Sequence, residues 1–114
     1  MKNQGALAEQ WAAHFLQNQG LKLIEHNYRC RFGEIDLIMQ DGATLVFVEV
    51  RLRRNADFGG AAASIDIRKQ QRLIRTSQQY LCGLVRTPAC RFDAILLSDA
   101  QGRNAQWLKN AFDA

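Results

Sequence analysis

The sequence has few cysteines and no long apolar segment, and both shortages exclude classes of protein. Its three cysteines, Cys30, Cys82 and Cys90, are odd in number and lack C-x-x-C spacing. This pattern is typical of reduced thiols and argues against a disulfide framework or a zinc site. No apolar run approaches the length of a membrane span. The segment 1–15 contains Glu9 and no long apolar core, so we expect no signal peptide and a cytoplasmic protein without membrane contact.

The length and composition indicate one globular domain. The chain has 114 residues, of which 47% are hydrophobic and 23% charged. This is enough for a single core and is unlike a disordered chain, so we predict one domain spanning residues 1–114. The formal net charge is +4, and eleven of the fifteen basic residues are arginines. Arginine suits bidentate phosphate contacts, but where the cations lie says more than their number.

The segment 33–54 predicts a β-hairpin. Two short apolar runs, 35–39 and 45–50, lie on either side of Asp41-Gly42. This dipeptide favours a two-residue type I′ turn, because both turn positions need a positive φ.

That turn fixes a register between the two strands. With Asp41 and Gly42 in the loop, Asp36 lies opposite Phe47 and becomes a diagonal neighbour of Glu49 on the same face. The opposite face is wholly apolar. Two adjacent acids call for a cation, and two candidates remain open: a divalent metal such as Mg²⁺ or Mn²⁺, or Arg51 on the same face. An ordinary solvated face with salt bridges remains open as well.

Periodicity along the rest of the chain predicts helices and strands around this hairpin. A helical stripe is formed by Ala8, Trp11, Ala12, Phe15 and Leu16. One sheet with helices on its faces would bury this stripe and the apolar hairpin face. Besides the hairpin, the expected elements are a helix over 4–18, a strand over 21–28, a second helix, a strand over 91–97 and a short apolar element at 107–108. The second helix is expected to have Ser64 as its N-cap and Asp66 in its first turn, and to end at about Cys82 or Gly83.

The second predicted helix carries a row of cations. Arg68, Arg72 and Arg75 follow the spacing i, i+4, i+7, with Lys69 beside them and no acid to pair them. Phosphate contact and an idle solvated face are the two interpretations, and we favour phosphate. Arg68, Lys69, Arg72 and Arg75 are therefore predicted to bind nucleic acid.

The hairpin residues resemble a known nuclease signature. Asp36 followed by Glu49-Val50-Arg51 resembles the D…E-x-K motif of PD-(D/E)xK nucleases. The segments GEIDLI (33–38) and FVEVR (47–51) resemble, more closely, the YraN-like family, which is similar to Holliday junction resolvases. Arg51 stands where the superfamily has lysine, and an arginine cannot give up a proton. Further matches to the family are Gly5, Glu9, Leu16, Leu73, Tyr80, Leu81 and the R-F-D sequence Arg91-Phe92-Asp93.

The resemblance implies a fold and a site. The fold is an α/β restriction-endonuclease-like αβββαβ core with a mixed central sheet flanked by helices. The implied ligands of Mg²⁺ or Mn²⁺ are Asp36, Glu49 and Glu9, and the implied catalytic residues are these three with Arg51. The resemblance also implies that Lys69 or Gln70 points toward the site and that Arg53 and Arg54 border the substrate groove, so Arg53, Arg54 and Gln70 join the predicted nucleic-acid-binding residues. Asp93 is interpreted as structural, with Arg91 or a neighbouring backbone group as its partner.

The leading hypothesis is a metal-dependent endonuclease that hydrolyses phosphodiester bonds in structured or branched DNA. By analogy with resolvases, the resemblance also implies a homodimer. The alternative is a non-catalytic nucleic-acid-binding protein that retains the nuclease-like fold. A third possibility is an interaction module whose basic helix binds an acidic partner.

Overall fold

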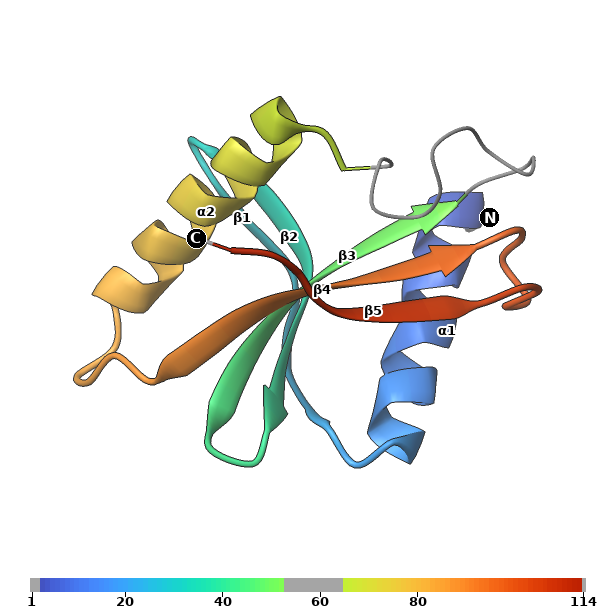
Figure 1. The fold of residues 1–114 in the computed structure, drawn as a ribbon, viewed down its shortest axis with the longest axis horizontal. Coiled ribbons are helices and arrows are strands. Elements are labelled where there is room, and N and C mark those ends of the chain that lie inside the picture. The colour runs from blue at the N-terminus through green and yellow to red at the C-terminus, as the bar shows by residue number, and fades with distance from the viewer. Residues whose placement is uncertain (1–2, 53–64, 114) are drawn as a thin grey trace.

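The computed structural model describes residues 3–52 and 65–113, in which two helices flank a five-stranded sheet (Figure 1). In this described part, neither helix is long and apolar enough to cross a membrane. All three cysteines are free thiols. In chain order the elements are α1 (Gln4–Asn18), β1 (Lys22–Cys30), β2 (Gly33–Asp41), β3 (Thr44–Leu52), α2 (Ile67–Cys82), β4 (Ala89–Leu97) and β5 (Gln106–Phe112).

The sheet is mixed, as predicted. Its strands lie in the order β1-β2-β3-β4-β5. β3 and β4 are parallel because α2 lies between them in the chain, and every other neighbouring pair is antiparallel. α1 and α2 cover opposite faces of the sheet (Figure 1). The expected α/β fold, with the αβββαβ order of a restriction-endonuclease-like core, is confirmed.

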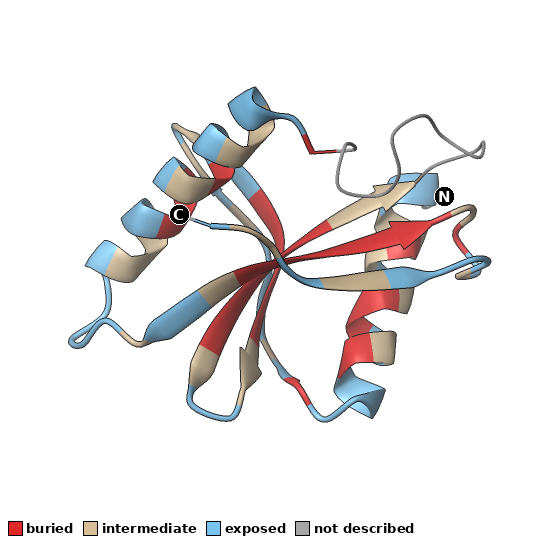
Figure 2. Cartoon of the chain, viewed as in Figure 1, coloured by how far each residue is buried: buried red, intermediate tan, exposed pale blue. Residues whose placement is uncertain are grey.

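Each face of the sheet carries its own apolar core (Figure 2). Leu16 of α1 packs against Val46 and Val48 of β3. The intervening residue Phe47 points to the other side, where its ring lies 5.5 Å from that of Phe92, between centroids. β3 is central and buried on both faces, which explains why its sequence is an unbroken apolar run before Glu49.

Each helix begins at a side chain that caps its first turn. The Asn3 carboxamide accepts a hydrogen bond from the backbone nitrogen of Ala6 at 2.7 Å. The Asp66 carboxylate accepts one from the backbone nitrogen of Lys69 at 2.8 Å. Asp66 is therefore the N-cap of α2 and not the first-turn residue that was predicted, while Ser64, the predicted N-cap, lies outside the described residues.

The hairpin turn lies one residue later than predicted. Asp41 pairs with Thr44, so Gly42 and Ala43 form the loop. Gly42 has a φ of 61° at the first loop position, which is the arrangement of a type II′ turn, and the prediction of a type I′ turn at Asp41-Gly42 was wrong. The sum of paired residue numbers changes by two, so the paired side chains keep their predicted faces. Ile35 is the exception, because it packs beneath α2 and not on the face of Leu37 as predicted.

The last strand is longer than the short apolar element predicted at 107–108. β5 pairs with β4 along most of its length, and the register shifts around Asp93. Asn110 has a φ of 53° in this irregular segment. Polar residues at the bulge interrupt the period-two pattern, so the sequence alone did not indicate a full strand.

Gly102 lies where the turn after β4 crosses the Trp11 ring of α1. Its φ is 86°, and a Cβ atom placed on it would overlap the indole. We expect Gly102→Ala to lower the free energy of unfolding by about 2–4 kcal/mol, from left-handed backbone strain and overpacking together. Gly42→Ala is the matched control, because Gly42 has a φ of 61° but no atom within 4 Å of an added Cβ. It should cost only about 1–2 kcal/mol. Equal losses in urea unfolding would contradict the role of the Trp11 contact.

Candidate functional site

The two acids of the hairpin lie opposite each other where the pairing of β2 and β3 ends. From the turn outward, the last backbone pair is Leu37 with Val48. Continued by one residue, this register places Asp36 opposite Glu49. The predicted position opposite Phe47 was wrong, because it followed from the wrong turn. Asp36 Oδ2 accepts a hydrogen bond from the backbone nitrogen of Val50 at 2.8 Å. This carboxylate therefore binds a backbone donor of β3 and is held against that strand.

The alternation of side chains between the two faces of the sheet is interrupted at Asp36 in β2. Ile35 packs in the core beneath α2, whereas Leu37, two residues later, packs beneath α1. β1 shows the same change of side between Tyr28 and His26, around Asn27 with its φ of 54°. Residues two apart in a regular strand share a face, so both strands are distorted beside the acidic pair.

A third acid comes from α1. The Glu9 and Glu49 carboxyl groups both lie close enough to Asp36 for its charge to act on them. Burial raises the pKa of Glu9 to about 7, with a further contribution from the charge of Asp36. The pKa of Glu49 is also raised to about 7, again by burial first and Asp36 second. Both glutamates are therefore harder to ionise here than in water.

Two cations contact Glu49. Lys69 Nζ of α2 lies 3.3 Å from Glu49 Oε2, and Arg51 Nη1 lies 3.7 Å from the same oxygen. Lys69 lowers the pKa of Glu49, but less than burial and Asp36 raise it. Lys69 was predicted on the phosphate-binding face of the helix without an acidic partner. Helical periodicity does not show which strand residue a side chain meets, and only the family resemblance implied that Lys69 or Gln70 points toward the site.

The acids suit a hard cation that prefers oxygen ligands, such as Mg²⁺ or Mn²⁺. Across 3–52 and 65–113, no group of three His, Cys, Asp or Glu side chains is arranged to hold a metal ion. Mg²⁺ usually takes only one or two carboxylates and completes its shell with water and substrate phosphate. Asp36 and Glu49 fit that mode of binding, with Glu9 beside them.

The remaining residues predicted to bind nucleic acid differ in their surroundings. The Gln70 side chain donates a hydrogen bond to the backbone oxygen of Ile65 at 2.9 Å, which holds the start of α2. Arg53 and Arg54 lie outside the described residues. The α2 arginines that are exposed and form no ion pair with another described residue are Arg68, Arg72 and Arg75.

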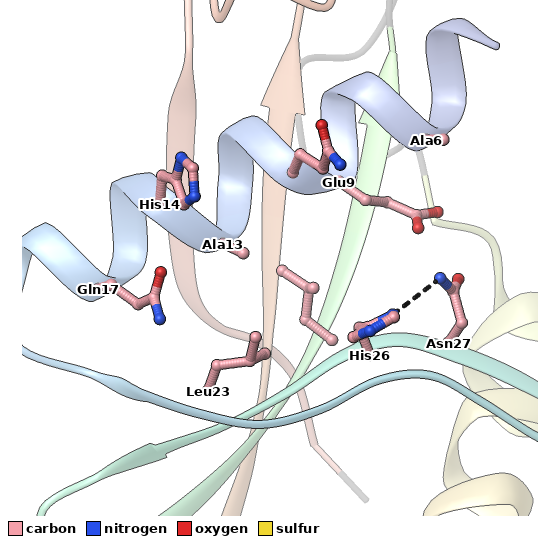
Figure 3. A pocket seen from close by; sticks show the side chains of 10 residues that line it. Ala6, Glu9, Ala13, His14, Gln17, Leu23, His26 and Asn27 are labelled. Atoms are coloured by element: carbon pink, nitrogen blue, oxygen red, sulfur yellow. Dashed lines mark hydrogen bonds between the residues drawn. The ribbon is translucent and has the colours of Figure 1, made fainter. Parts of the chain in front are cut away.

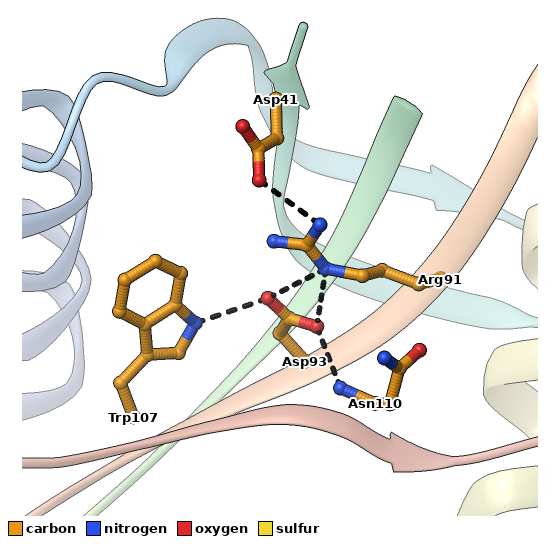
Figure 4. Close-up of polar contacts among 5 residues, drawn as sticks. All are labelled: Asp41, Arg91, Asp93, Trp107 and Asn110. Carbon is orange, nitrogen blue, oxygen red and sulfur yellow. Dashed lines mark hydrogen bonds and ion pairs between the residues drawn. The ribbon is translucent and has the colours of Figure 1, made fainter. Parts of the chain in front are cut away.

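Asp93 is the centre of a buried polar network, as Figure 4 shows. It accepts hydrogen bonds from Arg91 Nε at 3.0 and 3.2 Å and from Trp107 Nε1 at 3.0 Å. The backbone nitrogen of Asn110 donates a further bond at 3.0 Å, and Arg91 Nη1 reaches Asp41 Oδ2 at 3.0 Å. The expected structural pairing of Asp93 with Arg91 is confirmed.

A pocket between α1 and β1 was not predicted. Its volume is about 340 Å³, and its lining includes Glu9, His14, His26 and Asn27 (Figure 3). His14 belongs to α1 and His26 to β1, and their spacing in the sequence does not indicate a common site. Only the packing of α1 on β1 brings them together. Glu9 links this pocket to the acidic pair.

The fold and the acidic pair define the class of the protein. It is an α/β protein with a restriction-endonuclease-like core, whose candidate site lies where two neighbouring strands separate. The model of the family described as "Uncharacterised protein family UPF0102" matches residues 8–97. The chain belongs to this family, as its YraN-like motifs predicted.

Curated relatives match over nearly their whole length. A UPF0102 protein of Nitrosospira multiformis is 53% identical over 113 residues, which cover 99% of this chain and 95% of the relative. One from Nitrosomonas eutropha is 60% identical over 112 residues, with 98% and 95% covered. One from Methylobacillus flagellatus is 54% identical over 114 residues, with both chains fully covered.

Proposed function

We propose that this protein is a cytoplasmic, metal-dependent endonuclease that hydrolyses phosphodiester bonds in structured or branched DNA. The observation that supports it is the position of Asp36 and Glu49, two buried acids opposite each other at the separation of β2 and β3. Such a pair suits a divalent cation, and the exposed arginines of α2 suit phosphates. A homodimer is part of the proposal by analogy with resolvases only.

The residues around the acids suit distinct roles in phosphate hydrolysis. Mg²⁺ or Mn²⁺ bound by Asp36 and Glu49 would supply polarisation of the phosphate and a more acidic water. The hydrogen bond from the β3 backbone orients the Asp36 carboxylate before any ligand arrives. Glu9, with its pKa near 7, is suited to accept a proton from the attacking water at neutral pH. Lys69 and Arg51 supply positive charge for the phosphate oxygens.

Asp36→Asn should lower the rate of DNA cleavage about 100- to 1,000-fold. The amide oxygen can still accept the hydrogen bond from Val50, so the variant removes charge with little change of shape. The measurement is cleavage of four-way junction, flap and single-stranded DNA in Mn²⁺. Glu25→Gln, which changes an exposed strand carboxylate, should leave the rate unchanged. Absence of cleavage by the wild type, or full activity of Asp36→Asn, would contradict the proposal.

The α2 arginines should determine how steeply DNA binding depends on salt. Removal of one arginine that binds a phosphate should reduce the slope of log K against log salt by about 0.9. We expect the triple glutamine variant of Arg68, Arg72 and Arg75 to reduce this slope by about 2–3. Arg103→Gln is the control, since Arg103 is exposed in a turn and pairs with Asp99. If Arg103→Gln reduced the slope by as much per charge removed as the triple variant, only net charge would matter.

The alternative, a non-catalytic nucleic-acid-binding protein with this fold, is favoured by one observation. Lys69 and Arg51 already lie against Glu49, which is where a metal would otherwise balance its charge. Calorimetric titration with Mn²⁺, on wild type and Glu49→Ala, separates the two functions. DNA binding without any Mn²⁺ uptake would favour the alternative. Failure to bind DNA at low salt would instead favour an acidic protein partner for α2.

A further inference from the structure

The pocket between α1 and β1 opens beside the acidic residues. Glu9 lies in its wall (Figure 3), and Leu37, which directly follows Asp36 in β2, also lines it, so the pocket and the acids adjoin. α1 forms one wall and β1 the other, and the buried side chain of Leu37 contributes an apolar surface. A volume of about 340 Å³ lies within the range of small-ligand sites.

The lining of the pocket combines hydrogen-bonding groups with apolar surface. Gln10 and Gln17 present amides, each with a donor and an acceptor, and His14 and His26 present imidazole rings. The amide nitrogen of Asn27 pairs with His26 Nδ1 at 3.3 Å, and its oxygen is an acceptor. None of the ten described residues that line it is a lysine or an arginine. A phosphate would therefore find no positive partner here. A flat heterocycle would find rings on which to stack and amides that match its polar edge.

We propose that this pocket holds an unpaired nucleobase of the nucleic acid whose phosphate lies at Asp36 and Glu49. The inference rests on the proposed function for the identity of the substrate. A base within a duplex cannot enter a recess between a helix and a strand without leaving its stack. The pocket therefore favours nucleotides that are already unpaired, as they are at a branch point or in a flap. It gives the chain a means of selecting DNA by structure without reading its sequence.

The first test needs no cleavage and no metal. Isotope-labelled protein in EDTA is titrated with free deoxynucleosides and followed by amide NMR. We expect shifts in the side-chain amides of Gln10, Gln17 and Asn27, with an affinity in the millimolar range. His14→Ala/His26→Ala should abolish these shifts. The control, Gln78→Ala/Gln79→Ala, removes two exposed side chains of α2 and should leave them unchanged.

The second test uses a flap whose unpaired nucleotide at the branch carries either a base or an abasic sugar. Loss of the base should reduce kcat/KM about tenfold for the wild type, and clearly less for the double histidine variant. If nucleosides bind the pocket but no DNA is cleaved, the base site stands and the nuclease function fails. If DNA is cleaved equally with and without the base, and nucleosides cause no histidine-dependent shifts, the base site is overturned and the nuclease function stands.

Discussion

Replacing Glu49 by glutamine should stabilise the metal-free protein at about pH 8, even though it removes the partner of Lys69. The pKa of Glu49 is raised from 4.5 to about 7 by burial and by Asp36. A carboxyl group of this kind favours the folded state below pH 4.5, and its contribution is lost as the pH rises through 7. Glutamine stays neutral throughout. We therefore expect the advantage of Glu49→Gln over wild type to grow by about 2–3 kcal/mol between the acidic and the basic end of this window.

The measurement is urea unfolding of both proteins across this pH range, in EDTA and then in Mn²⁺. Glu25→Gln, in an exposed position of β1, should differ from wild type by less than about 0.5 kcal/mol at every pH. Mn²⁺ at about 100 times its Kd should raise the stability of the wild type by about 2.7 kcal/mol at the basic end, and that of Glu49→Gln much less. If the difference in unfolding free energy between Glu49→Gln and wild type did not change with pH, ionisation of Glu49 would not destabilise the folded protein.

Asp93→Ala should lower the free energy of unfolding by about 3–5 kcal/mol. The Asp93 side chain is fully buried, and its removal leaves the indole nitrogen of Trp107 and the backbone nitrogen of Asn110 without their acceptor. Arg91, already with one buried nitrogen that has no partner among the described residues, would keep only Asp41. A domain of this size is stable by about 5–15 kcal/mol, so the variant should approach the limit of folding.

Chemical unfolding followed by tryptophan fluorescence measures this loss, because Trp107 contacts the network directly. Asp113→Ala is the matched control, since Asp113 is exposed just after β5 and should contribute within about 0.5 kcal/mol. Arg91→Met/Asp93→Ala tests the cause. If the unpaired guanidinium accounts for much of the loss, the double variant should be more stable than Asp93→Ala alone. A loss below about 1 kcal/mol for Asp93→Ala would contradict the importance of the network.

The sequence was sufficient for the fold and for the nearness of the two strand acids. The side-chain period of two placed Asp36 and Glu49 on one face, and this survived the wrong turn because the pairing sum changed by two. The position of the turn was predicted wrongly because both Asp41-Gly42 and Gly42-Ala43 are acceptable glycine-containing loops. The local sequence does not distinguish between these two loops. In the observed loop, Asp41 is the last residue of β2 and contacts Arg91 of β4, which is distant in the sequence.

The parts of the site that depend on packing between elements were beyond sequence reasoning. The contact of Lys69 with Glu49 joins α2 to β3, and the pocket joins α1 to β1. Neither follows from a periodicity, because a helix can rotate or slide over a sheet while keeping its apolar stripe buried. The raised pKa values of Glu9 and Glu49 depend on the same packing.

The irregular outer strands bear on how two copies of the chain would associate. β1 and β5 form the two edges of the sheet, and each combines a register shift with an asparagine in the left-handed region, Asn27 or Asn110. Distorted edges resist the addition of another strand, because their free backbone groups no longer form an even row. Self-association through a continuous intermolecular sheet is therefore disfavoured. A dimer of this protein should form through helices or loops, without hydrogen bonds between the edge strands of the two copies.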